Sequence, residues 1–178
     1  MKVFIIVDLQ NDFIDGALGT REAEAIVPNV VEKIKQAQGK LVVTTQDTHE
    51  ENYLDTLEGK KLPVVHCIRH SDGWNINHEI QDAIEQNQKD FAQYENICKI
   101  TFGYEGWKTF FGNLTEKPDE IEICGLCTDI CVISNALILR ALFPNTKIIV
   151  DSACCAGVTP QKHEAALEVM RSCQIDVV

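Results

Sequence analysis

Short apolar runs alternate along this chain with segments of helical periodicity, and this alternation limits the folds that the chain can adopt. The first run, residues 3–7, is continuously apolar, as expected for a strand that is buried on both faces. Further strands are expected at 41–45, 97–100, 121–124, 147–150 and 175–178, and helices at 22–38, 76–88, 104–111, 130–142 and from Pro160 onward. This pattern predicts an α/β fold, a three-layer doubly wound sheet, mainly parallel, of about six strands with helices on both faces.

Composition and charge restrict the class of protein. The 178 residues contain no repeat, linker or low-complexity segment, so we expect a single domain over 1–178. A formal charge of −11 disfavours nucleic acid and anionic membranes as partners. Eight cysteines can indicate a disulfide framework. We expect no signal peptide and no span of a bilayer, and therefore a reduced, cytoplasmic protein.

Polar or reactive residues follow four of the expected strands. They are Asp8, Asp47, Lys99 and the turn 124–131. In doubly wound sheets, ligands bind outside the carboxyl ends of the strands. We therefore expect these residues to meet at one edge of the sheet.

The turn Cys124-Gly-Leu-Cys-Thr-Asp-Ile-Cys131 joins an expected strand to an expected helix. It places Cys131 near a helix N-terminus, where unpaired N–H groups and the helix dipole favour a thiolate. The same N–H groups can hold an oxyanion. The turn therefore predicts a nucleophilic cysteine.

Two charged residues are candidate partners of this thiol. Asp8 can act as a general base at the end of the first strand, or it can simply form a turn. Lys99 can stabilise a thiolate beside a carboxylate, or it can be an ordinary solvated lysine. Local sequence leaves both alternatives open.

Asp47, His49 and His66 form a candidate metal site. An Asp-x-His pair with a third histidine downstream can supply nitrogen and oxygen ligands to a divalent ion. Loop or core histidines without a metal are the alternative, and His70 is a rival third ligand. His163 is expected on the surface of the last helix.

The pattern Cys124-x-x-Cys127-x-x-x-Cys131 also has a second interpretation, a thiolate metal site or a redox pair. No second pair with matching spacing follows, so this interpretation ranks below the nucleophile. The remaining expectation is that Cys67, Cys98, Cys124 and Cys173 are small core residues.

Several aromatic residues fall in or near the same loops. Some can stack on a flat substrate, and others can plug the edge of the core. The candidates are Phe13, Trp74, Phe102, Tyr104 and Trp107.

Taken together, the residues resemble the isochorismatase-like cysteine hydrolase superfamily, especially its nicotinamidase branch. Val-Asp-Leu-Gln-Asn-Asp-Phe13 is similar to the aspartate motif of that superfamily, and Gly125-Leu-Cys-Thr-Asp-Ile-Cys-Val132 to its nucleophile motif. Asp47-x-His49 with His66-Cys67 resembles the metal motif of nicotinamidases. The resemblance runs nearly end to end.

The resemblance implies a role for each matching residue. It implies a triad of Asp8, Lys99 and Cys131, and a divalent metal, zinc first and iron or manganese next, on Asp47, His49 and His66. It also implies a cis peptide between Leu126 and Cys127, so that the N–H groups of Cys127 and Cys131 form an oxyanion hole.

One motif departs from the branch pattern. The branch usually has Trp-Pro-x-His-Cys, where this chain has Leu62-Pro-Val-Val-His-Cys67. The missing Trp leaves Phe13 as the expected stacking platform. The segment after Lys99 also lacks the common Ser-Ala-Phe pattern. Both departures affect substrate identity more than reaction class.

The implied activity is hydrolysis of nicotinamide, or a similar small heteroaromatic amide, to the acid and ammonia through a thioester, as in NAD salvage. One alternative keeps the triad but changes the substrate to another small amide or a ureido compound. A second alternative is a non-enzymatic thiol metal or redox domain. Members of the superfamily commonly form dimers or tetramers, which is compatible with a homo-oligomer here.

Overall fold

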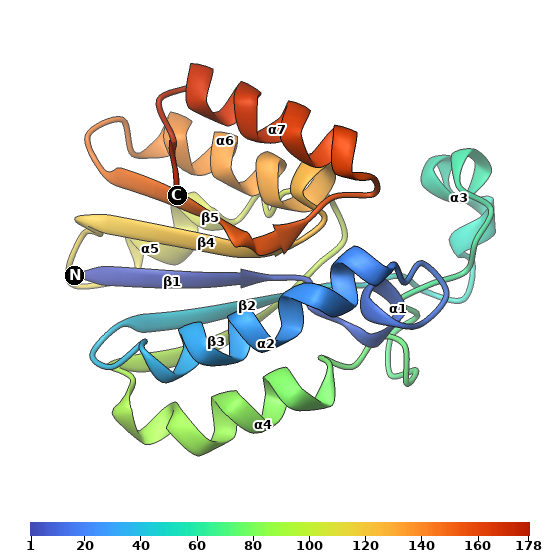
Figure 1. The fold of residues 1–178 in the computed structure, drawn as a ribbon, viewed down its shortest axis with the longest axis horizontal. Coiled ribbons are helices and arrows are strands. Elements are labelled where there is room, and N and C mark those ends of the chain that lie inside the picture. Colours follow the sequence, from blue (N-terminus) through green and yellow to red (C-terminus); the bar gives the residue numbers. More distant parts are fainter.

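Six parallel strands form one sheet at the centre of the molecule. The computed structural model describes all residues from 1 to 178. The strand order is β3-β2-β1-β4-β5-β6, with all paired strands parallel (Figure 1). The strands are β1 (Lys2–Val7), β2 (Leu41–Asp47), β3 (Gln93–Lys99), β4 (Glu120–Leu126), β5 (Lys147–Ala156) and β6 (Asp176–Val177). The predicted doubly wound sheet is confirmed.

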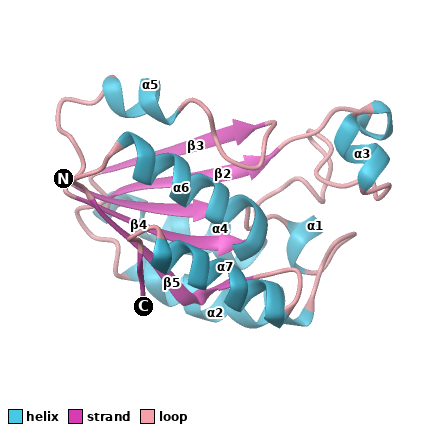
Figure 2. Ribbon diagram, turned by 90° about the horizontal axis from the view of Figure 1, so that it is seen from above, coloured by secondary structure: helices cyan, strands magenta, loops and turns pink.

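Helices cover both faces of this sheet. One face is covered by α2 and α4, and the other by α5, α6 and α7 (Figures 1 and 2). The longer helices are α2 (Arg21–Lys35), α4 (His78–Asn87), α6 (Ile133–Leu142) and α7 (Pro160–Ser172). The shorter helical segments are α1 (Asn11–Ile14), η1 (Tyr53–Asp55), α3 (Leu57–Lys61), η2 (Gln88–Asp90), α5 (Trp107–Gly112) and the π-helical turn η3 (Thr128–Val132). No helix is both long enough and apolar enough to cross a membrane.

The first strand lies at the centre because its side chains are apolar throughout. Residues 3–7 are at most 1% exposed, and β1 pairs with β2 on one side and β4 on the other. The register sets Val7 opposite Thr45 and Gly125. The carboxyl ends of three neighbouring strands therefore lie level at one edge.

Local signals determine where the long helices begin. Thr20 caps α2 by accepting the Ala23 N–H at 3.1 Å, and Thr159 caps α7 by accepting the Lys162 N–H at 3.2 Å. Pro160 occupies the first turn of α7, as its fixed φ favours. Helix α2 ends at Lys35 rather than at the predicted residue 38.

The largest differences from the sequence prediction concern strands and short helices. Strand β3 begins at Gln93, four residues before the predicted start. It is an edge strand with mostly exposed or half-buried side chains, so its first residues lack an apolar pattern. Strand β5 continues to Ala156. The segment α3, which projects from the body of the molecule in Figure 1, is too short to leave a periodic signal.

We expect Gly125→Ala to lower the free energy of unfolding by about 3 kcal/mol. Gly125 has a φ of +120°, which disfavours any side chain, and an added Cβ would meet the Val7 carbonyl oxygen of β1. The matched control is Gly112→Ala, where an added Cβ meets nothing within 4 Å. Urea denaturation measures both, and equal effects of the two changes would contradict the prediction.

Candidate active site

The predicted functional residues converge at the carboxyl edge of the sheet. Asp8 follows β1, Asp47 ends β2 and Lys99 ends β3. Cys131 lies in η3, directly after β4. The topology brings β1, β2 and β3 side by side, although the chain separates them by long connections.

Asp8, Lys99 and Cys131 form a buried cluster. The Lys99 ammonium lies 2.6 Å from Oδ2 of Asp8 and 3.6 Å from Sγ of Cys131. The side chains of Asp8 and Lys99 are fully buried, and Cys131 is 4% exposed. Thr45 donates its hydroxyl to the other oxygen of Asp8 at 2.7 Å. One ammonium therefore contacts both the carboxylate and the thiol.

Burial controls the protonation of the three groups. Burial raises the pKa of Asp8, Lys99 opposes this shift, and Asp47 adds to it. Burial also raises the pKa of the Cys131 thiol, and the Asp8 charge raises it further. Burial alone would lower the pKa of Lys99, but Asp8, Cys131 and Asp47 together raise it. The 2.6 Å contact between Lys99 and Asp8 is the geometry of a carboxylate–ammonium pair, and it lies beside a thiol whose pKa burial raises.

Proton transfer from Cys131 to Asp8 leaves the net charge of this cluster unchanged. It converts a carboxylate–ammonium pair into a thiolate–ammonium pair without adding a charge to the buried site. Because the Lys99 ammonium contacts both the Asp8 carboxylate and the Cys131 sulfur, it can stay paired with whichever of the two groups carries the negative charge. The geometry thus allows a thiolate to form in a place where burial alone would forbid it.

Hydrogen bonds hold the nucleophile turn. The peptide between Leu126 and Cys127 is cis. The carbonyl of Cys131 accepts the side-chain amide of Asn135 at 2.8 Å. The sequence prediction missed Asn135, which gave no motif signal within an apolar helix.

Three further contacts fix this turn and the start of α6 against their neighbours. Asn135 Oδ1 accepts the indole N–H of Trp107 at 2.8 Å and the backbone N–H of Tyr104 at 2.9 Å. His163 lies 2.8 Å from the hydroxyl of Thr128 and is half-buried, so it is less exposed than predicted. Trp107 is fully buried and packs in the hydrophobic core.

A second cluster lies beside the first. Nε2 of His49 is 3.0 Å from Oδ2 of Asp47, and Nε2 of His66 is 3.7 Å from the same oxygen. Oε1 of Glu58 is 3.7 Å from His49 and 4.0 Å from His66. One ligand atom from each of the four residues lies within 4.8 Å of the others. Two imidazoles and two carboxylates at this spacing suit a divalent transition metal.

The surroundings of these residues support the same conclusion. Nδ1 of His66 lies 2.8 Å from the Val64 carbonyl, which directs the Nε2 lone pair toward the cluster. The ring of Tyr53 packs 4.6 Å from that of His49 and 4.9 Å from that of His66. Gln10 accepts the Asp47 N–H at 2.7 Å and donates to the Asp47 carbonyl at 2.9 Å. The residues therefore fit a metal ion of this class.

This cluster differs from the sequence prediction in its fourth member. Glu58 comes from α3, and nothing in the sequence pattern around it indicated a ligand. The rival ligand His70 is outside the cluster and packs against Trp74 at 5.5 Å. Asp47 also lies 3.6 Å from the Lys99 ammonium, which joins this candidate metal site to the cluster of Asp8, Lys99 and Cys131.

The cysteines form neither a disulfide nor a metal cluster. All eight are free thiols, and the group of potential ligands contains none of them. The alternative site at Cys124, Cys127 and Cys131 is therefore not formed. Cys67 and Cys124 are buried as predicted, but Cys98 is exposed and Cys173 is half-buried.

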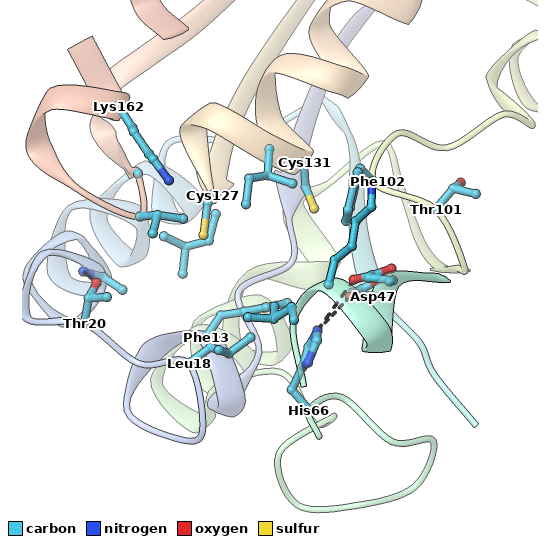
Figure 3. A pocket seen from close by; sticks show the side chains of 18 of the residues that line it. Phe13, Leu18, Thr20, Asp47, His66, Thr101, Phe102, Cys127, Cys131 and Lys162 are labelled. Carbon is cyan, nitrogen blue, oxygen red and sulfur yellow. Dashed lines mark hydrogen bonds and ion pairs between the residues drawn. The ribbon is translucent and has the colours of Figure 1, made fainter. Parts of the chain in front are cut away.

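A cavity of about 620 Å³ opens above both clusters. Cys131, Asp47, Glu58 and His66 line it, and the sulfur of Cys131 points into it (Figure 3).

Of the aromatic candidates, Phe13 and Phe102 line this cavity. Trp74 and Tyr104 do not; the indole N–H of Trp74 donates to Thr48 at 2.9 Å, and the ring of Tyr104 packs against Trp107 at 5.2 Å.

We expect Lys99→Met to lower the free energy of unfolding by about 3 kcal/mol, because it leaves a buried carboxylate without its cation. The double variant Asp8→Asn/Lys99→Met should recover at least about half of that loss, since neither charge remains. Lys108→Met, at an exposed lysine, is the control. Urea denaturation measures all three, and a single variant as stable as the control would show that the pair is not coupled.

Comparisons with known proteins agree with this geometry. A curated nicotinamidase/pyrazinamidase of Mycobacterium tuberculosis is 26% identical over all of this chain and 98% of its own length. Among solved structures, nicotinamidase/pyrazinamidase PncA from Bacillus subtilis has a TM-score of 0.85 at 23% identity, with 99% of this chain and 98% of that chain covered. Pyrazinamidase of Pyrococcus horikoshii, solved in complex with zinc, has a TM-score of 0.76 at 24% identity and the same coverage.

The structural likeness confirms the fold. The isochorismatase domain matches residues 2–178, which is nearly the whole sequence. The chain belongs to the isochorismatase family.

Proposed function

We propose that this amidohydrolase cleaves nicotinamide, or a similar small heteroaromatic amide, to the acid and ammonia through a thioester on Cys131. The contact of one buried ammonium with both Asp8 and Cys131 carries the proposal. The relatives named above, which are nicotinamidases and pyrazinamidases, support the substrate class.

The first half of the reaction forms the thioester. Asp8 takes the proton of Cys131, and Lys99 stays in contact with the resulting charge. The thiolate attacks the amide carbonyl, and the backbone N–H groups of Cys127 and Cys131, both of which line the cavity, hold the oxyanion. Asp8 then gives its proton to the departing ammonia.

The second half regenerates the enzyme. Asp8, again a carboxylate, takes a proton from the water that attacks the thioester, and it returns this proton to the Cys131 sulfur as the bond between sulfur and the acyl carbon breaks. Phe13 and Phe102 are positioned to contact the flat ring of the substrate, since both line the cavity (Figure 3). Division of amide cleavage into two steps lowers each barrier.

The proposal includes a divalent metal, zinc first and iron or manganese next. Asp47, His49, His66 and Glu58 would hold it, and zinc in the Pyrococcus horikoshii pyrazinamidase is consistent with this. Such an ion would supply a Lewis acid that binds and orients the heteroaromatic ring.

The proposed location of the protein is cytoplasmic.

A second candidate substrate class is another small amide or a ureido compound. The branch usually has a Trp directly before the proline of the metal motif, and Leu62 takes that place here. The cavity volume of about 620 Å³ is also within the range of roughly 300–1,000 Å³ that holds ligands larger than one ring. Both observations leave room for a substrate other than nicotinamide.

We expect Cys131→Ala and Cys131→Ser to abolish ammonia release from nicotinamide, because neither leaves a thiolate. Cys98→Ala, at an exposed cysteine outside the cavity, is the control and should retain activity. An enzyme-coupled ammonia assay measures all three variants. Turnover in either Cys131 variant would remove Cys131 as the nucleophile.

We expect chelation to remove both the metal and activity on nicotinamide, with zinc restoring them. His49→Ala should lose bound metal, and Glu58→Gln should weaken metal affinity by about 10-fold or more. Cys127→Ala is the matched control for a thiol ligand and should keep its metal. Elemental analysis of the purified proteins gives the metal content. Metal lost from Cys127→Ala and kept in His49→Ala would reverse the assignment.

A further inference from the structure

Two lysines line the cavity in addition to its apolar wall. Lys61 ends α3, and Lys162 lies in the first turn of α7. In Figure 3 the side chain of Lys162 runs from α7 toward the cavity, on the side of Cys127. The triad and the metal cluster use neither lysine. Their presence in the wall of this cavity therefore needs a separate explanation.

The stability of α7 does not explain Lys162. The first turn of a helix favours acidic residues, because its free N–H groups carry partial positive charge. In α7 that turn has no acidic residue and instead carries Lys162. The ion pairs of the chain include neither Lys61 nor Lys162. The positive charge of Lys162 is therefore available to a ligand.

The charge of Lys162 also reaches the reaction site. Burial raises the pKa of the Cys127 thiol to about 12, and the nearby Asp129 carboxylate adds to this shift, whereas Lys162 opposes it. Asp129 is directed elsewhere, since its Oδ1 accepts the Val158 N–H at 2.9 Å. An anion bound by Lys162 would thus lie near Cys127, one turn from the nucleophile.

We propose that Lys162 binds a carboxylate on the substrate, so that the cavity selects small amides that also carry an acid group. This inference rests on the proposed amidase function and names its substrate class. The amide would lie at Cys131, the apolar part against Phe13 and Phe102, and the carboxylate at Lys162. The carboxylate takes no part in bond making or breaking; the amide and water give the acid and ammonia as before.

The backbone around Lys162 favours a carboxylate over a phosphate. Phosphate sites usually combine several free N–H groups at a helix N-terminus. Here the Lys162 N–H already donates to Thr159 and the Val158 N–H to Asp129. A single ammonium remains, which suits a monoanion. Lys61 would add attraction at the mouth of the cavity in a chain whose net charge is −11.

Matched pairs of substrates test the proposal. Ammonia release is measured in the presence of zinc for benzamide and 3-carbamoylbenzoate, and for nicotinamide and 5-carbamoylnicotinate. We expect kcat/KM to be about 10-fold higher for the acid of each pair, with the difference mainly in KM. High salt should reduce this ratio.

Variants of Lys162 test whether this side chain causes the acid-to-neutral ratio of kcat/KM. Lys162→Gln should reduce the acid-to-neutral ratio about 10-fold, and Lys162→Arg should keep it within about threefold, because the charge remains. Lys108→Gln is the matched control, since Lys108 is an exposed lysine in the first turn of α5 and does not line the cavity. A preference for the neutral amides, or a ratio that Lys162→Gln leaves unchanged, would overturn the proposal.

A binding measurement separates this proposal from the proposed amidase function. In the Cys131→Ala background, calorimetry compares benzamide with 3-carbamoylbenzoate, with and without Lys162→Gln. Tighter binding of the acid that Lys162→Gln weakens about 10-fold supports the role of Lys162, even where the wild-type protein releases no ammonia and the amidase function fails. Absence of binding of the acid, or equal binding with and without Lys162→Gln, would refute the role of Lys162.

Discussion

The site depends on one buried ammonium. Lys99 contacts the Asp8 carboxylate at 2.6 Å, the Cys131 sulfur at 3.6 Å and the Asp47 carboxylate at 3.6 Å. A buried carboxylate is costly without a cation, and a buried thiolate equally so. Because one cation serves both, a proton can move between them without a change in net charge. The same cation also contacts Asp47 of the candidate metal site, so the charges of the two clusters act on each other.

The sheet topology provides this arrangement. β2 lies between β1 and β3, so the residues that follow or end these strands are neighbours although the chain separates them. Asp47 is level with Lys99 in the β2–β3 register. β4, on the other side of β1, delivers the nucleophile turn. β1, β2 and β4, whose side chains are buried along nearly their whole length, form the rigid support that such a site requires.

The sequence predicted the fold class and placed Asp8, Lys99 and Cys131 at one edge, because continuous apolar strands leave a strong signal and their carboxyl ends are known binding positions. It did not predict Glu58 or Asn135. Glu58 lies on a five-residue helix, and Asn135 is one polar residue within an apolar helix. Their roles arise from packing between distant segments, which local patterns do not encode. The early start of β3 was missed for a similar reason, since an edge strand needs no apolar alternation.

The residues of the cluster around Lys99 and the residues of the cavity wall lie on different kinds of segment. The triad is supported by strand ends and the first turn before α6, where movement of a single group would break several buried contacts. The cavity wall instead comes from short or connecting segments, including Phe13 of α1, Glu58 of α3 and Phe102 after β3. Loops tolerate substitution far better than buried strands do. Substrate preference can therefore change through residues such as Phe102 while the cluster around Lys99 stays the same, which is why the missing tryptophan bears on the substrate and not on the reaction.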